Sequence, residues 1–178
     1  MFTSLLPLLL GALVNAAPAA DAEGRGDAGL LKRTVAVGRN SYGYQVYVPA
    51  SLGTLARFTE EGGIGPTPVY AHAVTGWLRA AWPEADEEEW EYAALMAAAD
   101  ASVGLLTEED RPRRVVVVAE VNDLTEDRES TEVTVDSAIP ERVIQAIQAD
   151  TVDIDPSLPE QLGDLGWFGV QEIPFLLG

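Results

Sequence analysis

The feature that most constrains the fold is a continuous apolar run, Val115-Val116-Val117-Val118-Ala119. β-Branched residues favour strands, and a strand without polar alternation needs cover on both faces. The run therefore predicts a central strand over Arg114 to Val121, with packing layers above and below it. Thr131 to Asp136 alternates between apolar and polar residues, which needs only one covered face. We expect these two strands to pair antiparallel, with Val133 and Val135 facing inward.

Other segments supply the surrounding layers. Tyr44 to Val48 and Pro68 to Val74 read as strands, and Ser51 to Glu61 reads as a helix that ends at Gly62-Gly63. Thr75 is expected to cap a short helix. Asp86 is expected to cap the longest helix, with an apolar stripe at Tyr92, Leu95, Met96, Ala99, Val103 and Leu106.

The C-terminal half completes the predicted topology. Pro140 suits a helix start, with Val143, Ile144 and Ile147 on its buried face, and Thr151 to Asp155 alternates like a strand with Val152 and Ile154 inward. From residue 67 the order is strand, helix, strand, strand, helix, strand. We therefore predict an α+β fold in which a mixed sheet carries helices. Its core is a ferredoxin-like split βαβ unit at about residues 67–155, preceded by an extra strand and helix.

Charge divides the chain into two parts. Residues 1–45 carry three acidic and four basic residues, whereas residues 46–178 carry 26 acidic and seven basic residues, a net charge of −19. We expect residues 1–44 to be an extension outside the fold and residues 45–178 to form a single domain. The apolar run Leu5 to Val14 has the length of a signal-peptide core, but no basic residue precedes it. The extension is thus either a secretory signal, over residues 1–19, with a linker, or the product of a start codon assigned too far upstream.

Composition excludes several classes of function. A body this acidic repels nucleic-acid phosphate and anionic lipid, so we expect neither nucleic acid nor membrane as a partner. The chain has no cysteine, which excludes disulfides, thiolate nucleophiles and cysteine-ligated metals. Basic proteins, cations or no partner at all remain, and among partners we expect a protein or a second copy of the chain.

Several segments occur together in a familiar order. They are Val46-Tyr47-Val48-Pro49-Ala50-Ser51-Leu52, Ala73-Val74-Thr75, Asp86-Glu87-Glu88-Glu89 with Glu91-Tyr92-Ala93-Ala94-Leu95, Arg113-Arg114-Val115-Val116-Val117, and Gln171-Glu172-Ile173-Pro174. From about residue 46 to the end, this ordered set resembles a family of small acidic actinobacterial proteins described only as a domain of unknown function. The resemblance implies a cytosolic protein that begins near Val46, and so favours the upstream-start interpretation. It implies no activity, cofactor or catalytic residue.

Two patterns that could be functional have simpler structural explanations. His72 is the only histidine, and no second ligand or nucleophile lies at a recognisable spacing, so we expect a partly buried strand residue with one satisfied ring nitrogen. The acidic run Asp86 to Glu91 is explained by a capped helix start, where negative charge suits the helix dipole.

A third pattern resembles a calcium loop. Acidic and hydroxyl residues occupy four of its ligand positions, at Asp153, Asp155, Ser157 and Asp164. Leu158 stands where the loop needs glycine for its sharp turn, so we treat the match as chance and expect no metal or other cofactor.

The C-terminal segment holds the remaining candidate. It is apolar without helical or strand period, and its aromatic pair is flanked by polar residues, as at the centre and rim of an interface. We expect an interaction surface at Trp167, Phe168, Gln171 and Glu172. The sequence thus favours a non-catalytic, cytosolic domain that binds a protein partner or itself, with no catalytic residue to name. The alternative is a small-molecule enzyme or ligand sensor that uses carboxylates in a pocket between the sheet and this segment.

Overall fold

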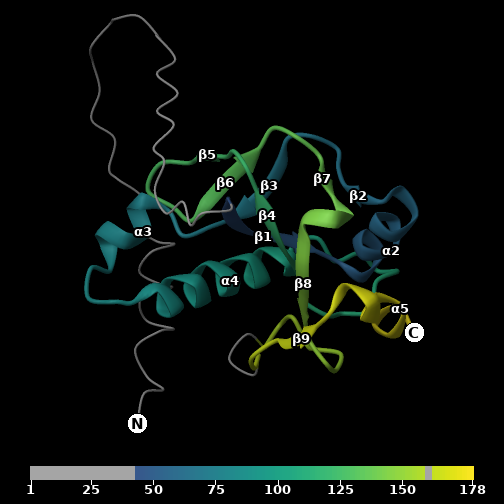
Figure 1. Cartoon of the computed structure of the whole chain (residues 1–178). Coiled ribbons are helices and arrows are strands. Elements are labelled where there is room, and N and C mark those ends of the chain that lie inside the picture. Colours follow the sequence, from purple (N-terminus) through teal and green to yellow (C-terminus); the bar gives the residue numbers. More distant parts are fainter. Residues whose placement is uncertain (1–42, 159–161) are drawn as a thin grey trace, which may run out of the picture.

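A seven-stranded antiparallel sheet with helices on both faces organises the computed structural model (Figure 1), which describes residues 43–158 and 162–178. The expected extension, residues 1–44, therefore lies outside the described residues except at its last two positions. The sheet order is β5-β6-β3-β1-β4-β8-β9, and a second sheet pairs β2 with β7. The strands are β1 (Tyr44–Ala50), β2 (Gly63–Ile64), β3 (Val69–His72), β4 (Val115–Val121), β5 (Thr125–Glu126), β6 (Glu132–Val135), β7 (Ile139–Pro140), β8 (Ile144–Ala149) and β9 (Gly166–Phe168).

The apolar run forms an interior strand, as predicted, but with different neighbours. β4 pairs antiparallel with β1 along seven residues and with β8 on its other side. β6 pairs instead with β3 and β5, so the predicted pairing of β4 with β6 is wrong. Val133 and Val135 nevertheless face inward and are buried, as expected. The strand that we placed ahead of the core, β1, occupies the middle of the sheet.

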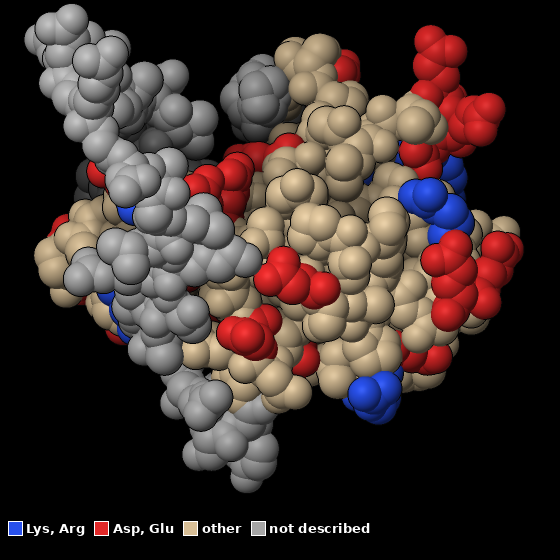
Figure 2. Space-filling model, turned by 90° about the horizontal axis from the view of Figure 1, so that it is seen from above, with Lys and Arg blue, Asp and Glu red and all other residues tan. Residues whose placement is uncertain are grey.

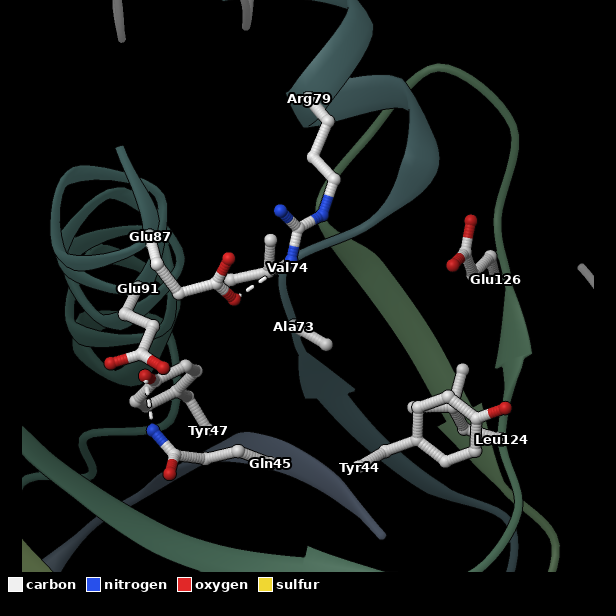
Figure 3. Close-up of a pocket in the computed structure, with 10 residues that line it drawn as sticks. All are labelled: Tyr44, Gln45, Tyr47, Ala73, Val74, Arg79, Glu87, Glu91, Leu124 and Glu126. Atoms are coloured by element: carbon white, nitrogen blue, oxygen red, sulfur yellow. Dashed lines mark hydrogen bonds and ion pairs between the residues drawn. The ribbon is translucent and has the colours of Figure 1, made fainter. Parts of the chain in front are cut away.

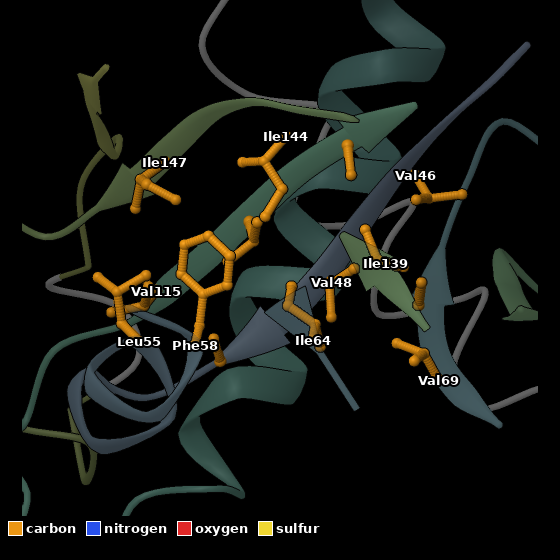
Figure 4. Packing of buried hydrophobic residues seen from close by; sticks show 14 of the residues in the cluster. Val46, Val48, Leu55, Phe58, Ile64, Val69, Val115, Ile139, Ile144 and Ile147 are labelled. Atoms are coloured by element: carbon orange, nitrogen blue, oxygen red, sulfur yellow. The ribbon is translucent and has the colours of Figure 1, made fainter. Parts of the chain in front are cut away.

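One face of the sheet is covered by α2 (Leu52–Glu61) and α5 (Ile173–Leu177). Leu55 and Phe58 of α2, with Ile173 and Leu176 of α5, join a core built from alternate residues of the strands (Figure 4). The Ser51 hydroxyl accepts a hydrogen bond from the Thr54 backbone N–H at 3.2 Å, and Gly62 ends the helix in the left-handed conformation. This helix therefore begins and ends where the sequence predicted.

The other face is covered by α4 (Glu87–Val103), with α3 (Gly76–Ala81) beside its N-terminal end (Figure 1). The buried side of α4 is made of alanines, mainly Ala94, Ala98 and Ala99, which pack against Val116 and Val118. The larger residues of the predicted stripe, Leu95 among them, lie half-buried on the flanks. Small side chains let the helix backbone approach the sheet closely, so bulk is a poor guide to the buried face here.

The ferredoxin-like topology is wrong because its predicted second helix is a strand. After a 3₁₀ turn, η1 (Glu141–Val143), the chain runs as β8 between β4 and β9. Every pairing among the described strands is antiparallel, so the sheet is not mixed. The α+β class itself is confirmed.

The predicted strand at Thr151 to Asp155 is also wrong. The chain leaves the sheet at Asp150, and Val152, expected inward, is 67% exposed. Asp153 pairs with Arg111 and Arg113 at 3.0 and 2.7 Å. Ion pairs to the arginines before β4 thus hold this segment in place. The alternation of its apolar and polar residues does not reflect a strand.

Candidate functional site

Helix α4 brings a row of carboxylates to one face of the sheet. Asp86 and Glu89 form a reciprocal capping box, in which each side chain accepts a hydrogen bond from the other's backbone N–H at 3.0 and 2.9 Å. The predicted cap is thereby confirmed. Because Glu89 is engaged by the cap, Glu87, Glu88 and Glu91 are the acidic side chains left to face neighbouring elements.

An acidic pocket lies between α4, α3 and the start of β1 (Figure 3). Arg79 of α3 reaches into it and its Nη2 donates to Glu87 Oε1 at 2.7 Å. The same guanidinium lies over the indole ring of Trp90, with Cζ 4.4 Å from the ring centroid. Carboxylate and indole together thus hold one guanidinium at this site. The pocket lining is Tyr44, Gln45, Tyr47, Ala73, Val74, Arg79, Glu87, Glu91, Leu124 and Glu126.

Burial shifts the ionisation of several groups in this pocket. Burial, reinforced by the negative charges of Glu87 and Glu88, raises the pKa of the Glu91 carboxyl. Burial also raises the pKa of Glu126, although its carboxylate accepts a hydrogen bond from the Gly76 N–H at 3.2 Å. The phenol of Tyr47 accepts from Gln45 Nε2 at 2.6 Å, and burial raises its pKa above that of a free tyrosine. These groups therefore hold protons more tightly than they would in water.

An open groove adjoins the pocket on the other side of α4. This α4 groove has a volume of about 500 Å³, and it shares Gln45, Tyr47 and Glu91 with the pocket. Neither lysine nor arginine lines it among the described residues. Its lining is Gln45, Tyr47, Glu88, Glu91, Tyr92, Leu95, Val118, Gln145, Ala146, Gln148 and Trp167.

Trp167 stands at the edge of the α4 groove with 63% of its surface exposed. It lies on β9 opposite Gln148 of β8, so the sheet holds both side chains beside α4. At the neighbouring position along the helix, the Tyr92 hydroxyl donates to Asp164 Oδ1 at 2.7 Å. Burial, and next that hydrogen bond, raise the pKa of Tyr92 to about 12. The groove therefore offers exposed aromatic surface together with carboxylates.

The other three residues of the predicted interaction surface are placed differently. Phe168 follows Trp167 in β9 and packs against the core on the α2 and α5 face. Gln171 and Glu172 are exposed in the 3₁₀ turn η3 (Val170–Glu172), where Glu172 accepts a hydrogen bond from the Gly169 N–H at 2.7 Å. Of the four, only Trp167 lines the α4 groove.

The structure also places the remaining sequence candidates. His72 is 8% exposed, and its Nδ1 lies 2.8 Å from the Thr131 hydroxyl, as expected for a buried strand histidine with one satisfied nitrogen. In the calcium-like pattern, Asp155 accepts hydrogen bonds from the Ser157 backbone N–H and hydroxyl, while Asp153 and Asp164 bind the partners described above. No group of three or more potential metal ligands occurs within residues 43–158 and 162–178.

Sequence reasoning missed the residues that the fold brings to α4 from other elements, namely Gln45, Tyr47, Arg79 and Glu126. One signal was available for Arg79, since it is the only basic residue between Arg57 and Arg111. A lone arginine in such an acidic stretch is expected to pair with one of the nearby carboxylates, so Arg79 points to an acidic site. Nothing in the sequence indicates that Glu126, 47 residues further on, faces the same pocket.

The comparisons with known proteins give one match. The profile of a family of unknown function, DUF6912, matches residues 44–177. Searches of curated proteins and of solved structures find no match to this chain. In the part of the chain that the structure describes, no helix is both long and apolar enough to cross a membrane. The matched range spans most of the chain, and the chain belongs to the family of unknown function DUF6912.

Proposed function

We propose that this domain is a protein-binding module, and that the α4 groove receives an arginine-bearing segment of a partner protein. The observation that carries the proposal is the exposed indole of Trp167 in the same groove as Glu88 and Glu91. Arginine suits such a surface because its guanidinium stacks on aromatic rings and pairs with carboxylates.

The fold already holds one guanidinium by these two kinds of contact. Arg79 is paired with Glu87 and stacked on Trp90 in the adjoining acidic pocket. The α4 groove has the same chemical groups, an indole and carboxylates, without a basic residue of its own. An incoming arginine would supply the missing cation.

Net charge favours a basic partner over a second copy of the chain. Residues 46–178 carry a net charge of −19, and on the face in Figure 2 acidic groups outnumber basic ones around a broad uncharged area. Two such bodies repel each other at long range, whereas a basic partner is attracted. Steering of this kind raises association rates and weakens with added salt.

The test is calorimetric titration of the protein with hexa-arginine at low and near-physiological salt. Glu88→Gln/Glu91→Gln removes two charges from the α4 groove. Glu108→Gln/Glu109→Gln removes two exposed charges that do not line it, so it is matched in net charge. We expect the first variant to weaken binding at least tenfold and the second less than threefold. Equal losses in the two variants would show unspecific attraction and contradict the proposal.

The raised pKa of Glu91 favours a second candidate, a small cationic ligand held in the α4 groove, because the acidic pocket, at about 40 Å³, is too small for one. Argininamide, which carries a single guanidinium group, separates the two functions. If it binds as tightly as hexa-arginine, the domain is a small-molecule sensor. If only the peptide binds tightly, the partner is a protein.

We also propose a cytoplasmic location. Mapping the N-terminus of the endogenous protein tests this. A mature end near residues 17–20 in an exported fraction would instead identify a cleaved signal peptide.

A further inference from the structure

The hydrogen-bond ladder of the sheet is interrupted between β1 and β3, two neighbouring strands of its interior. β1 pairs with β4 along its whole length, but its pairing with β3 is limited to Tyr47 and His72. Beyond that pair the ladder stops, and a pocket of about 520 Å³ lies between the strands and the loop before β3. β3 still runs beside β1 past that pair, but Pro49 has no backbone N–H to donate, so it cannot continue the ladder.

The walls of this strand-gap pocket are mostly apolar. Val48 and Pro49 come from β1, and Val69 and Ala71 come from β3. Ala101 of α4 and Leu105, in the turn just after that helix, close it on the helix side. A concave apolar site of this volume with few polar groups is typical of small-molecule sites.

His72 supplies a polar group in that lining. Its side chain is more than nine-tenths buried, and its Nδ1 is engaged by the Thr131 hydroxyl. Nε2 has no hydrogen-bond partner among the described residues and keeps some accessible surface, so it is free to hydrogen-bond to a ligand. Burial lowers the pKa of His72 to about 4, so the ring is neutral at pH 7.

Charge at the rim selects against anions. Glu132, the β6 residue paired with His72, is exposed and lines the same pocket, and the lining contains no lysine or arginine. A carboxylate or phosphate ligand would meet a like charge there and no cation to pair with. A neutral imidazole adds no positive charge to offset this.

We infer that the strand-gap pocket binds an uncharged, mostly apolar small molecule whose single polar group hydrogen-bonds to Nε2 of His72. The apolar walls supply the affinity by removing the ligand from water, and the imidazole fixes its orientation. This site lies between β1 and β3 and shares no lining residue with the α4 groove or the acidic pocket, so it is independent of the protein-binding proposal.

NMR of the imidazole signal of His72, the only histidine in the chain, tests this inference directly. The probes are 2-naphthol and 2-naphthoate, which match in size and differ in charge. We expect a saturable shift with 2-naphthol and at least tenfold weaker binding of 2-naphthoate. The absence of a saturable shift with 2-naphthol, or equal affinity for the two probes, would overturn the inference.

Two variants locate the binding. Ala101→Trp places a large side chain at the pocket from an exposed helix position, and Leu105→Trp does so from a second, 46% exposed position. Ala80→Trp, at an exposed position of α3 outside the pocket lining, is the matched control. Binding of 2-naphthol should be lost in the first two variants and kept in the third. Unchanged binding in both pocket variants would also overturn the inference.

Discussion

Arg114 shows what a single buried residue contributes to this fold. Its side chain is fully buried, and it donates to the Asp150 carboxylate through Nε at 3.0 Å and Nη2 at 2.7 Å, while Nη2 also donates to the Gly163 carbonyl at 2.6 Å. The Asp150 carboxylate additionally accepts the Arg114 backbone N–H at 2.8 Å. This pair joins the start of β4 to the end of β8 and to the segment before β9.

We therefore predict that Asp150→Asn is strongly destabilising, because it leaves a buried guanidinium without its counter-charge. Losing one partner of a buried pair costs about 3–5 kcal/mol of unfolding free energy. The control is Asp153→Asn, which removes an exposed ion pair with Arg111 and Arg113 and should change stability little. Urea denaturation of both variants measures the difference, and equal stability of the two would contradict this account of Arg114.

His72 makes stability depend on pH in a defined direction. Burial lowers its pKa from the ordinary value of 6.5 to about 4 in the folded state, so protonation favours the unfolded chain. The stability due to its neutral form is fully present above pH 6.5 and is lost as the pH falls towards 4. At 1.36 kcal/mol per pKa unit the loss is about 3 kcal/mol.

His72→Gln should remove this dependence while the titrating carboxylates remain. Denaturation of the wild type and the variant between pH 7.5 and 4 checks it. The stability advantage of the wild type should stay constant above about pH 6.5 and shrink from there towards pH 4. A difference that stays constant with pH would show that the imidazole does not change its charge on unfolding.

Among the elements, β4 is the one whose role follows most directly from sequence. Val117 is 1% exposed and belongs to the core on the α2 and α5 face. Val117→Asp should prevent folding, because an unpaired buried charge can exceed the 5–15 kcal/mol of stability of a small domain. Val152→Asp, at a 67% exposed valine, is the matched control and should fold normally. Circular dichroism of the two variants tests this, and a folded Val117→Asp protein would disprove the central role of β4.

β8 shows why periodicity misled the prediction. Ile144 and Ile147 are three residues apart, which indicates a helix face. In the structure Ile147 lies opposite Val117 and Ile144 lies opposite Ala119, with a register shift that leaves Gln145 as the extra residue. This bulge brings both isoleucines to the same side of the strand, where they join one core. A bulge can therefore imitate helical spacing, and no local pattern separates the two.

Local signals nevertheless located most of the other elements. The caps at Ser51, Thr75 and Asp86 make the hydrogen bonds expected of them, since capping depends on residues within one turn. Strand pairing and the acidic pocket depend on contacts between distant segments, such as the hydrogen bond from the Gly76 N–H to Glu126. The sequence therefore predicted three helix starts correctly and a fourth, at Pro140, wrongly. It predicted strand partners poorly, and of the candidate site it predicted only Trp167.

At the scale of the whole molecule, one long helix, α4, with the short α3 beside it, covers one face of a seven-stranded sheet. α4 packs on β1 and β4 and leaves the β8 and β9 side of that face lining the α4 groove. The opposite face is closed by α2 and α5 over the larger core (Figure 4). This asymmetry, with a strongly acidic body, is the basis for placing partner binding beside α4.

The affinity of a Trp167→Ala variant for hexa-arginine, measured alongside its unfolding free energy, tests that claim most directly. Trp167 is 63% exposed, so its truncation should change stability by less than about 1 kcal/mol, in line with other surface substitutions. Because the exposed indole is the proposed contact for the guanidinium, affinity should fall at least tenfold in the folded variant. A loss of several kcal/mol of stability with affinity unchanged would contradict the account and make Trp167 a part of the domain's own packing.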